Sequence, residues 1–257
     1  MQGQFVWYEL LARNFPAAQS FYTSLLGWQV VPAEIPGMDY HIVVNENLPI
    51  GGMFPMTGDC PGPNGGGWIG YVAVEDVDDM AGRIEALGGR ILMAPEDIPD
   101  IGRFAVVADP EGAPFVIFRA LDPSIHKPLP AMKPGFTAWH ELVVDDWERA
   151  FRFYETLFGW QKDEAMDMGP MGVYQLFSTD GKQAVGGMMK RQNGDAMGWR
   201  FYFGVEDIDA AMARVKAGGG SISFGPEQVP GDAWIVQGRD PQGSQFALVG
   251  QRQGAAS

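Results

Sequence analysis

Two glutamates in this 257-residue chain occupy positions where a carboxylate could carry out chemistry. Glu9 and Glu141 lie 132 residues apart, each inside a short apolar segment. Apolar surroundings raise the pKa of a carboxyl group, which can then accept a hydrogen bond from a ligand or act as the base on a carbon acid. We therefore predict Glu9 and Glu141 as the catalytic candidates. The alternative is a structural carboxylate paired with an arginine such as Arg13 or Arg200.

Tryptophans accompany these glutamates in both halves of the chain. An indole carried on a strand presents a broad, rigid surface on which a flat ligand can stack. We expect such walls to bind a ligand, and packing in the core is the alternative for each residue. The tryptophans concerned are Trp7, Trp68, Trp139 and Trp199.

The elements that must position these residues occur twice. Phe21-Tyr22 returns as Phe153-Tyr154 with the offset that separates the glutamates, and Gly27-Trp28 returns as Gly159-Trp160. Matches with a constant offset indicate that one structural unit is repeated. An Asp-Pro-x-Gly turn at 109–112 also recurs, with an offset of 131.

Each half is predicted to contain two βαβββ modules. The first module has a strand over 5–12, a helix with Asn14 as its N-cap and Gly27 as its C-cap, and three further strands. The later helices begin after Asp76, after Asp145 or Asp146, and after Asp207. The predicted strands after the first helix span 28–31, 40–44 and 50–54, and those of the second module span 68–74, 90–93, 104–108 and 115–118. The fold class is α+β, with domains over 1–121 and 136–257 and a proline-rich linker over 122–135.

This organisation resembles the vicinal oxygen chelate superfamily, which includes glyoxalases, bleomycin resistance proteins and extradiol dioxygenases. The similarity covers essentially the whole chain and is greatest to tandem, two-domain glyoxalase-like proteins. It implies that each pair of modules curls eight strands into an open cup, with helices on the convex side and a ligand on the concave side. Alternation along the first strands then directs Trp7, Glu9 and Leu11 into one cup, and places Tyr8 and His140 on the helix side.

The resemblance also indicates where metal-dependent members carry their ligands. These positions correspond to Trp7, Ile69 and Val116 in the first half and to Trp139, Arg200 and Ala247 in the second. Such side chains offer no oxygen or imidazole donors to a divalent ion. We therefore predict no metal ligands and no cofactor, and we assign Ile69, Val116 and Arg200 to ligand binding. A site built from Glu9 and His41 is the remaining alternative.

Composition narrows the classes of partner. A formal charge of −14 disfavours nucleic acid and anionic membranes. The absence of an apolar run long enough to cross a bilayer, and of a basic leader before an apolar segment, favours the cytoplasm. Cys60 is the only cysteine, so no internal disulfide can form. We expect a monomer or a homodimer whose partner is a small molecule.

Two functions are consistent with these residues. The first is metal-free binding of a small organic molecule in one or both cups. The second is a glyoxalase-type lyase, or a related carbon-acid enzyme of the lactoylglutathione-lyase kind, in which Glu9 or Glu141 moves the proton.

Overall fold

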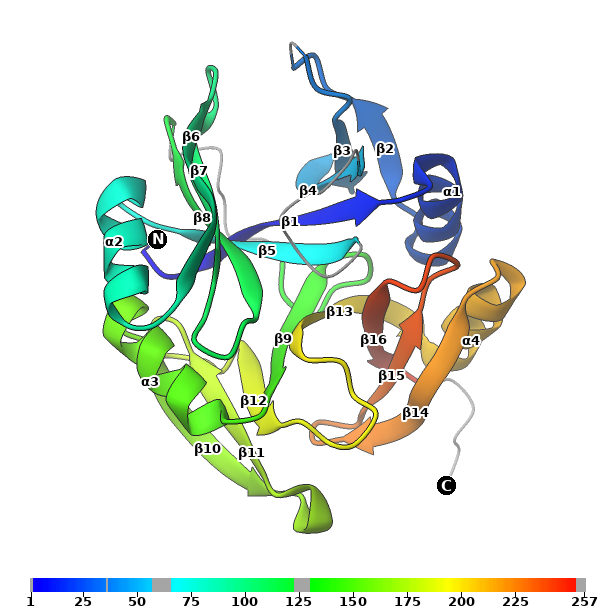
Figure 1. Ribbon diagram of the computed structural model, residues 1–257. Helices are drawn as coiled ribbons and strands as arrows, with labels where there is room; N and C mark the ends of the chain where they lie inside the picture. Colours follow the sequence, from blue (N-terminus) through cyan, green and yellow to red (C-terminus); the bar gives the residue numbers. More distant parts are fainter. Residues whose placement is uncertain (1, 36, 57–65, 123–129, 253–257) are drawn as a thin grey trace.

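The first half of the chain folds into one curled sheet in the computed structural model. Figure 1 shows β6 and β7 rising on one side of β1 and β5, and β2 and β3 rising on the other. The central strands β1 and β5 are antiparallel, and each pairs in parallel with an outer strand of its own module. In spatial order the strands are β2 (Gln29–Pro32), β3 (His41–Asn45), β4 (Leu48–Pro55), β1 (Phe5–Ala12), β5 (Gly67–Ala73), β8 (Pro114–Ala120), β7 (Gly102–Ala108) and β6 (Arg90–Ile98).

The second half repeats this topology strand for strand. The equivalent central pair is β9 and β13, which are also antiparallel. In spatial order the strands are β10 (Gln161–Asp167), β11 (Val173–Ser178), β12 (Gly186–Lys190), β9 (Thr137–Val144), β13 (Gly198–Asp207), β16 (Gln245–Gln251), β15 (Ala233–Arg239) and β14 (Ser221–Val229). The described residues thus form two eight-stranded sheets with few helices, and the predicted α+β fold of four βαβββ modules is confirmed.

The helices begin at the predicted residues, and the first helix also ends where predicted. The side chain of Asn14 accepts a hydrogen bond from the backbone of Ala17, and Gly27 closes the first helix with a φ of 73° that suits glycine. Of the two aspartates proposed for the third helix, Asp146 is the cap. The helices are α1 (Phe15–Leu26), α2 (Val77–Ala86), α3 (Trp147–Phe158) and α4 (Ile208–Ala217), with a short 3₁₀ helix at Gly169–Met171.

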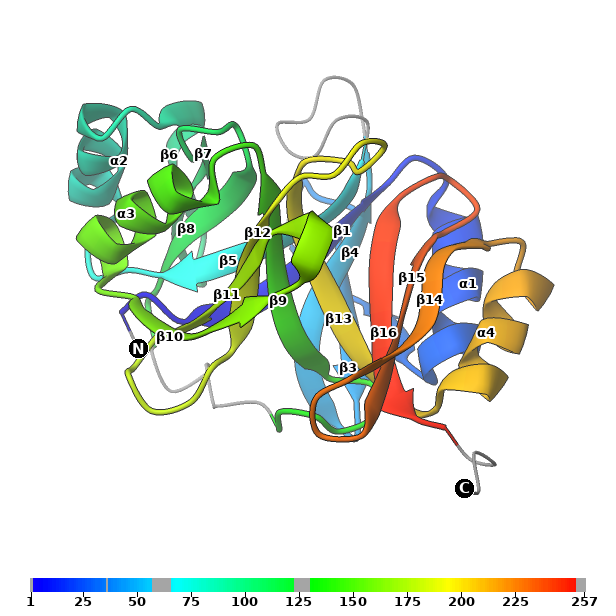
Figure 2. The same cartoon turned by 90° about the horizontal axis from the view of Figure 1, so that it is seen from below.

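The two sheets pack back to back through their helix-bearing faces. Figures 1 and 2 show α1 beside α4 at one end of this interface and α2 beside α3 at the other. Each of the two large core clusters contains buried residues from both halves, for example Tyr22 with Phe246 and Phe115 with Tyr154. The halves therefore share a core, and their opposite faces form the two cups.

The structure describes residues 2–35, 37–56, 66–122 and 130–252. Residues 57–65, which include Cys60, and residues 123–129 of the predicted linker, which include His126, lie outside these ranges. Among the described residues, no helix has the length and apolar character that a bilayer crossing requires.

Candidate functional site

Strand register assigns each predicted residue to a face. Glu9 is opposite Ile69, and Trp7 is opposite Tyr71, so these side chains share one face of the first sheet. Val116 is paired with Tyr71 and joins the same face. This face, which we call the first cup, carries an apolar cluster that includes Trp7, Ile69 and Val116.

The Glu9 carboxylate is buried in the first cup and is held by tyrosines. Tyr40 donates a hydrogen bond to Oε1 over 2.6 Å, and Tyr71 donates to Oε2. Nε1 of Trp7 donates to the Tyr40 hydroxyl over 2.9 Å. Burial raises the pKa of Glu9, although the tyrosine hydrogen bonds oppose that shift. Both carboxylate oxygens are therefore already engaged by the protein.

A glycine makes room for each of the tyrosines that reach across the cups. Gly52 is paired with Glu9 on the neighbouring strand, and a Cβ there would overlap the Tyr40 ring. Gly187 is paired with Glu141 in the same way, and a Cβ there would overlap the ring of Tyr174. The segment Gly51-Gly52-Met53 and its repeat Gly186-Gly187-Met188 are thus sites where a side chain approaches the strand closely, which explains the glycines there.

The second cup is the corresponding face of the second sheet and contains a related network with an added cation. Glu141 accepts hydrogen bonds from Tyr202 over 3.0 Å and from Tyr174 over 3.3 Å. Nη1 of Arg200 lies 2.5 Å from Oε2 of Glu141 in a buried ion pair. Burial lowers the pKa of Arg200, but the charge of Glu141 and the interactions with Tyr202 together outweigh this effect, and the pKa is raised overall. The alternative pairing of Glu141 with Arg200 is confirmed, whereas Glu9 is held by tyrosines and not by Arg13.

Trp139 occupies the position in the second cup that Trp7 has in the first. It lies on the same face as Tyr202, with which it is paired, and its Nε1 donates to the Tyr174 hydroxyl over 2.8 Å. Both tryptophans therefore lie on the concave faces, where each supports the tyrosine that reaches a glutamate.

The prediction that Trp68 and Trp199 line the cups is wrong, because both lie on the opposite faces of the sheets. Trp68 is paired with Leu10 and Trp199 with Leu142, which places both indoles in the shared core between the sheets. Trp68 donates to the hydroxyl of Tyr22 over 3.0 Å, and Trp199 makes the equivalent bond to Tyr154 over 3.1 Å. Adjacent strand residues point to opposite faces, so Trp68 cannot share a cup with Ile69, nor Trp199 with Arg200.

The repeated motifs around the helices join the two halves. Tyr22 donates to the carboxylate of Asp240, and Tyr154 donates to that of Asp109, so each tyrosine binds the Asp-Pro-x-Gly turn of the other half. The indole of Trp28 donates over 2.7 Å to the carbonyl of Gly135 at the end of the linker, and that of Trp160 donates over 2.7 Å to the carbonyl of Gly3 in the first half. These residues have packing roles.

The side chains of the cups do not fit a divalent ion. No group of three or more His, Cys, Asp or Glu converges among the described residues. The positions that would supply ligands carry alkyl and indole groups in the first cup, and in the second a guanidinium lies against the carboxylate. His41 is paired with Met53 on the helix side and packs against Phe15, so it cannot join Glu9 in a metal site.

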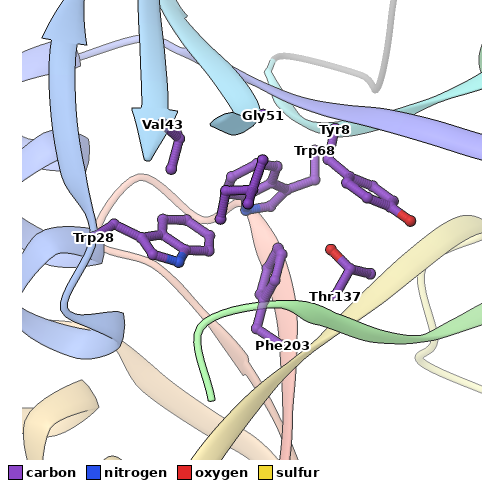
Figure 3. A pocket seen from close by; sticks show the side chains of 8 residues that line it. Tyr8, Trp28, Val43, Gly51, Trp68, Thr137 and Phe203 are labelled. Atoms are coloured by element: carbon purple, nitrogen blue, oxygen red, sulfur yellow. The ribbon is translucent and has the colours of Figure 1, made fainter. Parts of the chain in front are cut away.

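An internal pocket between the sheets is too small for an organic ligand. Figure 3 shows it between the indoles of Trp28 and Trp68 and the ring of Phe203, with Tyr8 and Thr137 beyond. Its volume is about 10 Å³, at the lower limit of what one water molecule needs. This pocket therefore reflects packing between the sheets and does not hold an organic ligand.

The second cup contains a cavity large enough for a small ligand. Its volume is about 290 Å³, close to the lower end of ordinary ligand sites. The connector between β12 and β13, yellow in Figure 1, supplies one side of the cavity. The side chains that distinguish this cavity are polar or aromatic: Asn193, Asp195, Arg200, Ser223, Phe224, Gln237, Arg239 and Gln245.

Equivalent positions in the first cup are apolar. Gln237 is paired with Ala247 as Val106 is paired with Val116, which aligns the two sheets with an offset of 131. By the same offset Arg200 corresponds to Ile69, and Arg239 to Ala108. The cups therefore share a glutamate–tyrosine network but differ in the chemistry of the surrounding surface.

Sequence reasoning missed the four tyrosines of the networks and the polar residues Gln237 and Arg239. Tyr71 and Tyr202 are part of the repeated segments that begin at Trp68 and Trp199, so their recurrence was a usable signal. Tyr40 and Tyr174 differ by 134 positions, because the intervening loops differ in length, and this concealed their equivalence.

The chain belongs to the glyoxalase/bleomycin resistance protein/dioxygenase superfamily. The model of that superfamily matches residues 136–248, and a glyoxalase-like domain model matches residues 8–118. The chain is 30% identical to the “Putative glyoxylase CFP32” of Mycobacterium tuberculosis, covering 96% of this chain and 95% of the relative. It is also 30% identical to the anthracycline biosynthesis protein DnrV of Streptomyces peucetius, covering 98% of this chain and 94% of that protein.

Solved structures with the same fold include enzymes of two kinds. One is the 2,2',3-trihydroxybiphenyl 1,2-dioxygenase of Sphingomonas wittichii, with a TM-score of 0.64, 14% identity, and coverage of 97% of this chain and 89% of that one. Another is the Mn(II)-bound glyoxalase of Novosphingobium aromaticivorans, with a TM-score of 0.65, 13% identity, and coverage of 98% and 82%. At these identities the likeness concerns the fold alone. The predicted superfamily is confirmed by the two family models and the 30% identical relatives.

Proposed function

We propose that this protein binds a small polar organic molecule in its second cup without using a metal ion. The observation that carries the proposal is the cavity of about 290 Å³ lined by Arg200, Gln237 and Arg239. Ligand sites are concave and place a few polar groups within a shaped surface. This cavity has such groups together with the exposed ring of Phe224.

The glutamates support binding more than proton transfer. Glu141 accepts hydrogen bonds from Arg200, Tyr174 and Tyr202, and both oxygens of Glu9 accept from tyrosines. A general base must be within hydrogen-bond reach of the proton it removes, and these donors compete for that position. Both carboxylates therefore serve to fix the tyrosines and Arg200 around the cups.

The two similar proteins named above are consistent with an organic ligand. One name refers to glyoxylase activity and the other to anthracycline biosynthesis, and both processes concern small organic molecules. The donor set of the second cup can hold such a molecule by hydrogen bonds and stacking, without an ion to bridge it.

Blocking the cavity tests the proposal. Polar metabolites are first screened for those that raise the melting temperature of the full chain, and calorimetry then confirms their binding. Ser223→Trp should abolish this binding because the indole fills the cavity. Leu92→Trp is the matched control, since Leu92 is the equivalent residue beside the first cup. Binding that survives Ser223→Trp would refute the proposed site, and a stoichiometric divalent ion in protein purified without chelator would refute metal-free binding.

A carbon-acid enzyme is the second candidate, and the raised pKa of Glu9 favours it. Burial makes the Glu9 carboxylate a stronger base, and its apolar surroundings suit abstraction of a proton next to a carbonyl group. Glu9→Gln and Glu141→Gln would each remove one base. Unchanged turnover of a hemithioacetal in both variants would exclude Glu9 and Glu141 as the base, and the absence of turnover in the wild type would exclude this function.

A further inference from the structure

We infer that the ligand of the second cup is an organic anion, held by Arg239 together with Arg200. This inference rests on the proposed function and specifies the chemical class of the molecule. It follows from the ion pairs of the two arginines. Arg200 is paired with a carboxylate, and Arg239 is not.

Arg239 provides a cation that no carboxylate neutralises. Its Nη1 donates to the carbonyl of Gly243 over 3.0 Å, and it takes part in none of the ion pairs found among the described residues. The guanidinium group has five N–H donors, so most remain free for a ligand. What sets Arg239 apart is its place, since it lines the cavity without a carboxylate partner.

Arg200 contributes its remaining donors to the same cavity. Its partner Glu141 does not line the cavity, whereas Arg200 does. Glu141 is also shared between Arg200 and the hydroxyls of Tyr174 and Tyr202, so its charge is distributed over three donors. In the first cup Glu9 is satisfied by tyrosines alone, so a buried carboxylate at this position does not require a cation.

One acidic residue, Asp195, also lines the cavity, and one of its oxygens is bound within the connector. Oδ2 of Asp195 accepts a hydrogen bond from the backbone of Gln192 over 3.1 Å, within the connector itself. Ser223, Asn193 and Gln245 add neutral polar groups to the lining. A carboxylate or phosphate ester can accept several charge-assisted hydrogen bonds from this set, and arginine matches the geometry of both groups.

The amide of Gln237 can orient a ligand in the cavity. Its Nε2 donates to the hydroxyl of Tyr202 over 2.8 Å, which leaves the amide oxygen as an acceptor. A ligand that bears a hydroxyl group beside its anionic group could therefore donate to Gln237 while the arginines hold the charge. The exposed ring of Phe224 provides an apolar surface for the rest of the molecule.

Three probes of the same shape and different charge test the inference. Benzoate, benzamide and benzamidine are titrated into the full chain by calorimetry at low ionic strength. We expect benzoate to bind at least about tenfold more tightly than benzamide, and benzamidine to bind least. Arg239→Gln should weaken benzoate by about tenfold and leave benzamide unchanged. Arg252→Gln is the control for net charge, because Arg252 pairs with Asp209 and is not part of the cavity.

The outcomes separate the two proposals. Equal binding of benzoate and benzamide, or equal effects of Arg239→Gln and Arg252→Gln, would overturn the anionic class while leaving a binding site that Ser223→Trp can still block. Failure of all three probes to bind would overturn the anion inference. If the metabolite screen also found no binding that Ser223→Trp abolishes, the proposed function would be refuted as well.

Discussion

The hydroxyl of Tyr8 donates a hydrogen bond to Nε2 of His140 over 2.6 Å, although the two residues occupy equivalent positions in repeats 132 residues apart. Nδ1 of His140 lies 2.7 Å from the carbonyl oxygen of Val185, so Nδ1 carries the proton and Nε2 is the acceptor. The first strands of the two sheets therefore meet face to face at this pair. At this contact the copy in the first half is the donor and the copy in the second half is the acceptor.

Acid should destabilise the protein through His140. Burial lowers the pKa of His140 from 6.5 to about 4, so between these values the unfolded chain binds a proton that the folded chain does not. The stability contributed by neutral His140 is complete above pH 6.5 and is lost as the pH falls toward 4, by about 2 kcal/mol between pH 7 and pH 5. Urea unfolding of the wild type at both pH values measures the change.

Asp109 acts in the opposite direction and must be separated from this effect. Burial raises its pKa to about 6, so its protonation favours the folded chain as the pH falls below that value. The double variant Tyr8→Phe/His140→Leu replaces both partners of the hydrogen bond and keeps Asp109. We expect this variant to lose less stability than the wild type between pH 7 and pH 5. Equal losses would show that His140 does not control the acid response.

Much of the fold could be predicted because local signals agree with the repeat. Helix caps such as Asn14 and Asp207 and the C-cap Gly27 mark the helices, and the period of two in the first strand correctly placed Glu9 in a cup and Tyr8 behind it. The prediction that β6 ends near Met93 was too short. The strand continues to Ile98 past Pro95, because a proline is tolerated on an edge strand.

The site was less accessible to sequence reasoning because it depends on pairing between distant strands. Trp68 and Ile69 were both assigned to the cup, yet only the pairing of Ile69 with Glu9 reveals which of the two neighbours faces the ligand side. The cavity beside Arg200 is formed by β14, β15 and the connector before β13. No local pattern predicts that Gln237 and Arg239 meet Arg200 there.

Removing the cation from the second cup should destabilise the fold moderately. Arg200→Ile reproduces the residue of the first cup and leaves Glu141 with the hydroxyls of Tyr174 and Tyr202. Breaking a buried ion pair by removing one partner commonly costs about 3–5 kcal/mol, and we expect a loss at the lower end because the tyrosines remain. Urea unfolding at pH 7 measures it. Adding Glu141→Gln to Arg200→Ile should restore part of the loss, and a further decrease in the double variant would contradict this explanation.

A methyl group at Gly52 should displace Tyr40 from the first cup. The Cβ of Gly52→Ala would overlap the hydroxyl and ring of Tyr40, so the tyrosine must leave Glu9. Overpacking of this kind costs about 1–3 kcal/mol. Gly82→Ala is the control, because a Cβ on this residue of α2 meets nothing within 4 Å and alanine favours a helix.

A double-mutant cycle distinguishes steric conflict from a general effect on the strand. Gly52→Ala combined with Tyr40→Ala should cost less than the sum of the two single substitutions, since the clash disappears with the ring. Thermal unfolding of the four proteins provides the comparison. Additive losses would show that Gly52 matters for the backbone of β4 and not for the space that Tyr40 occupies.

The two tyrosine–aspartate hydrogen bonds between the halves should each stabilise the packing of one half on the other. Tyr154→Phe removes the donor that lies 3.1 Å from Oδ2 of Asp109, while Oδ1 keeps its bonds to the backbone of Glu111 and Ala113. We expect a loss of about 1–2 kcal/mol. Because the Tyr154 hydrogen bond lowers the pKa of Asp109, that pKa should also rise above about 6 in the variant.

Carboxyl-detected NMR titration follows Asp109 directly, and Tyr22→Phe tests the equivalent contact with Asp240. A variant with wild-type stability and an unchanged Asp109 titration would show that the shared apolar core alone holds the two halves together.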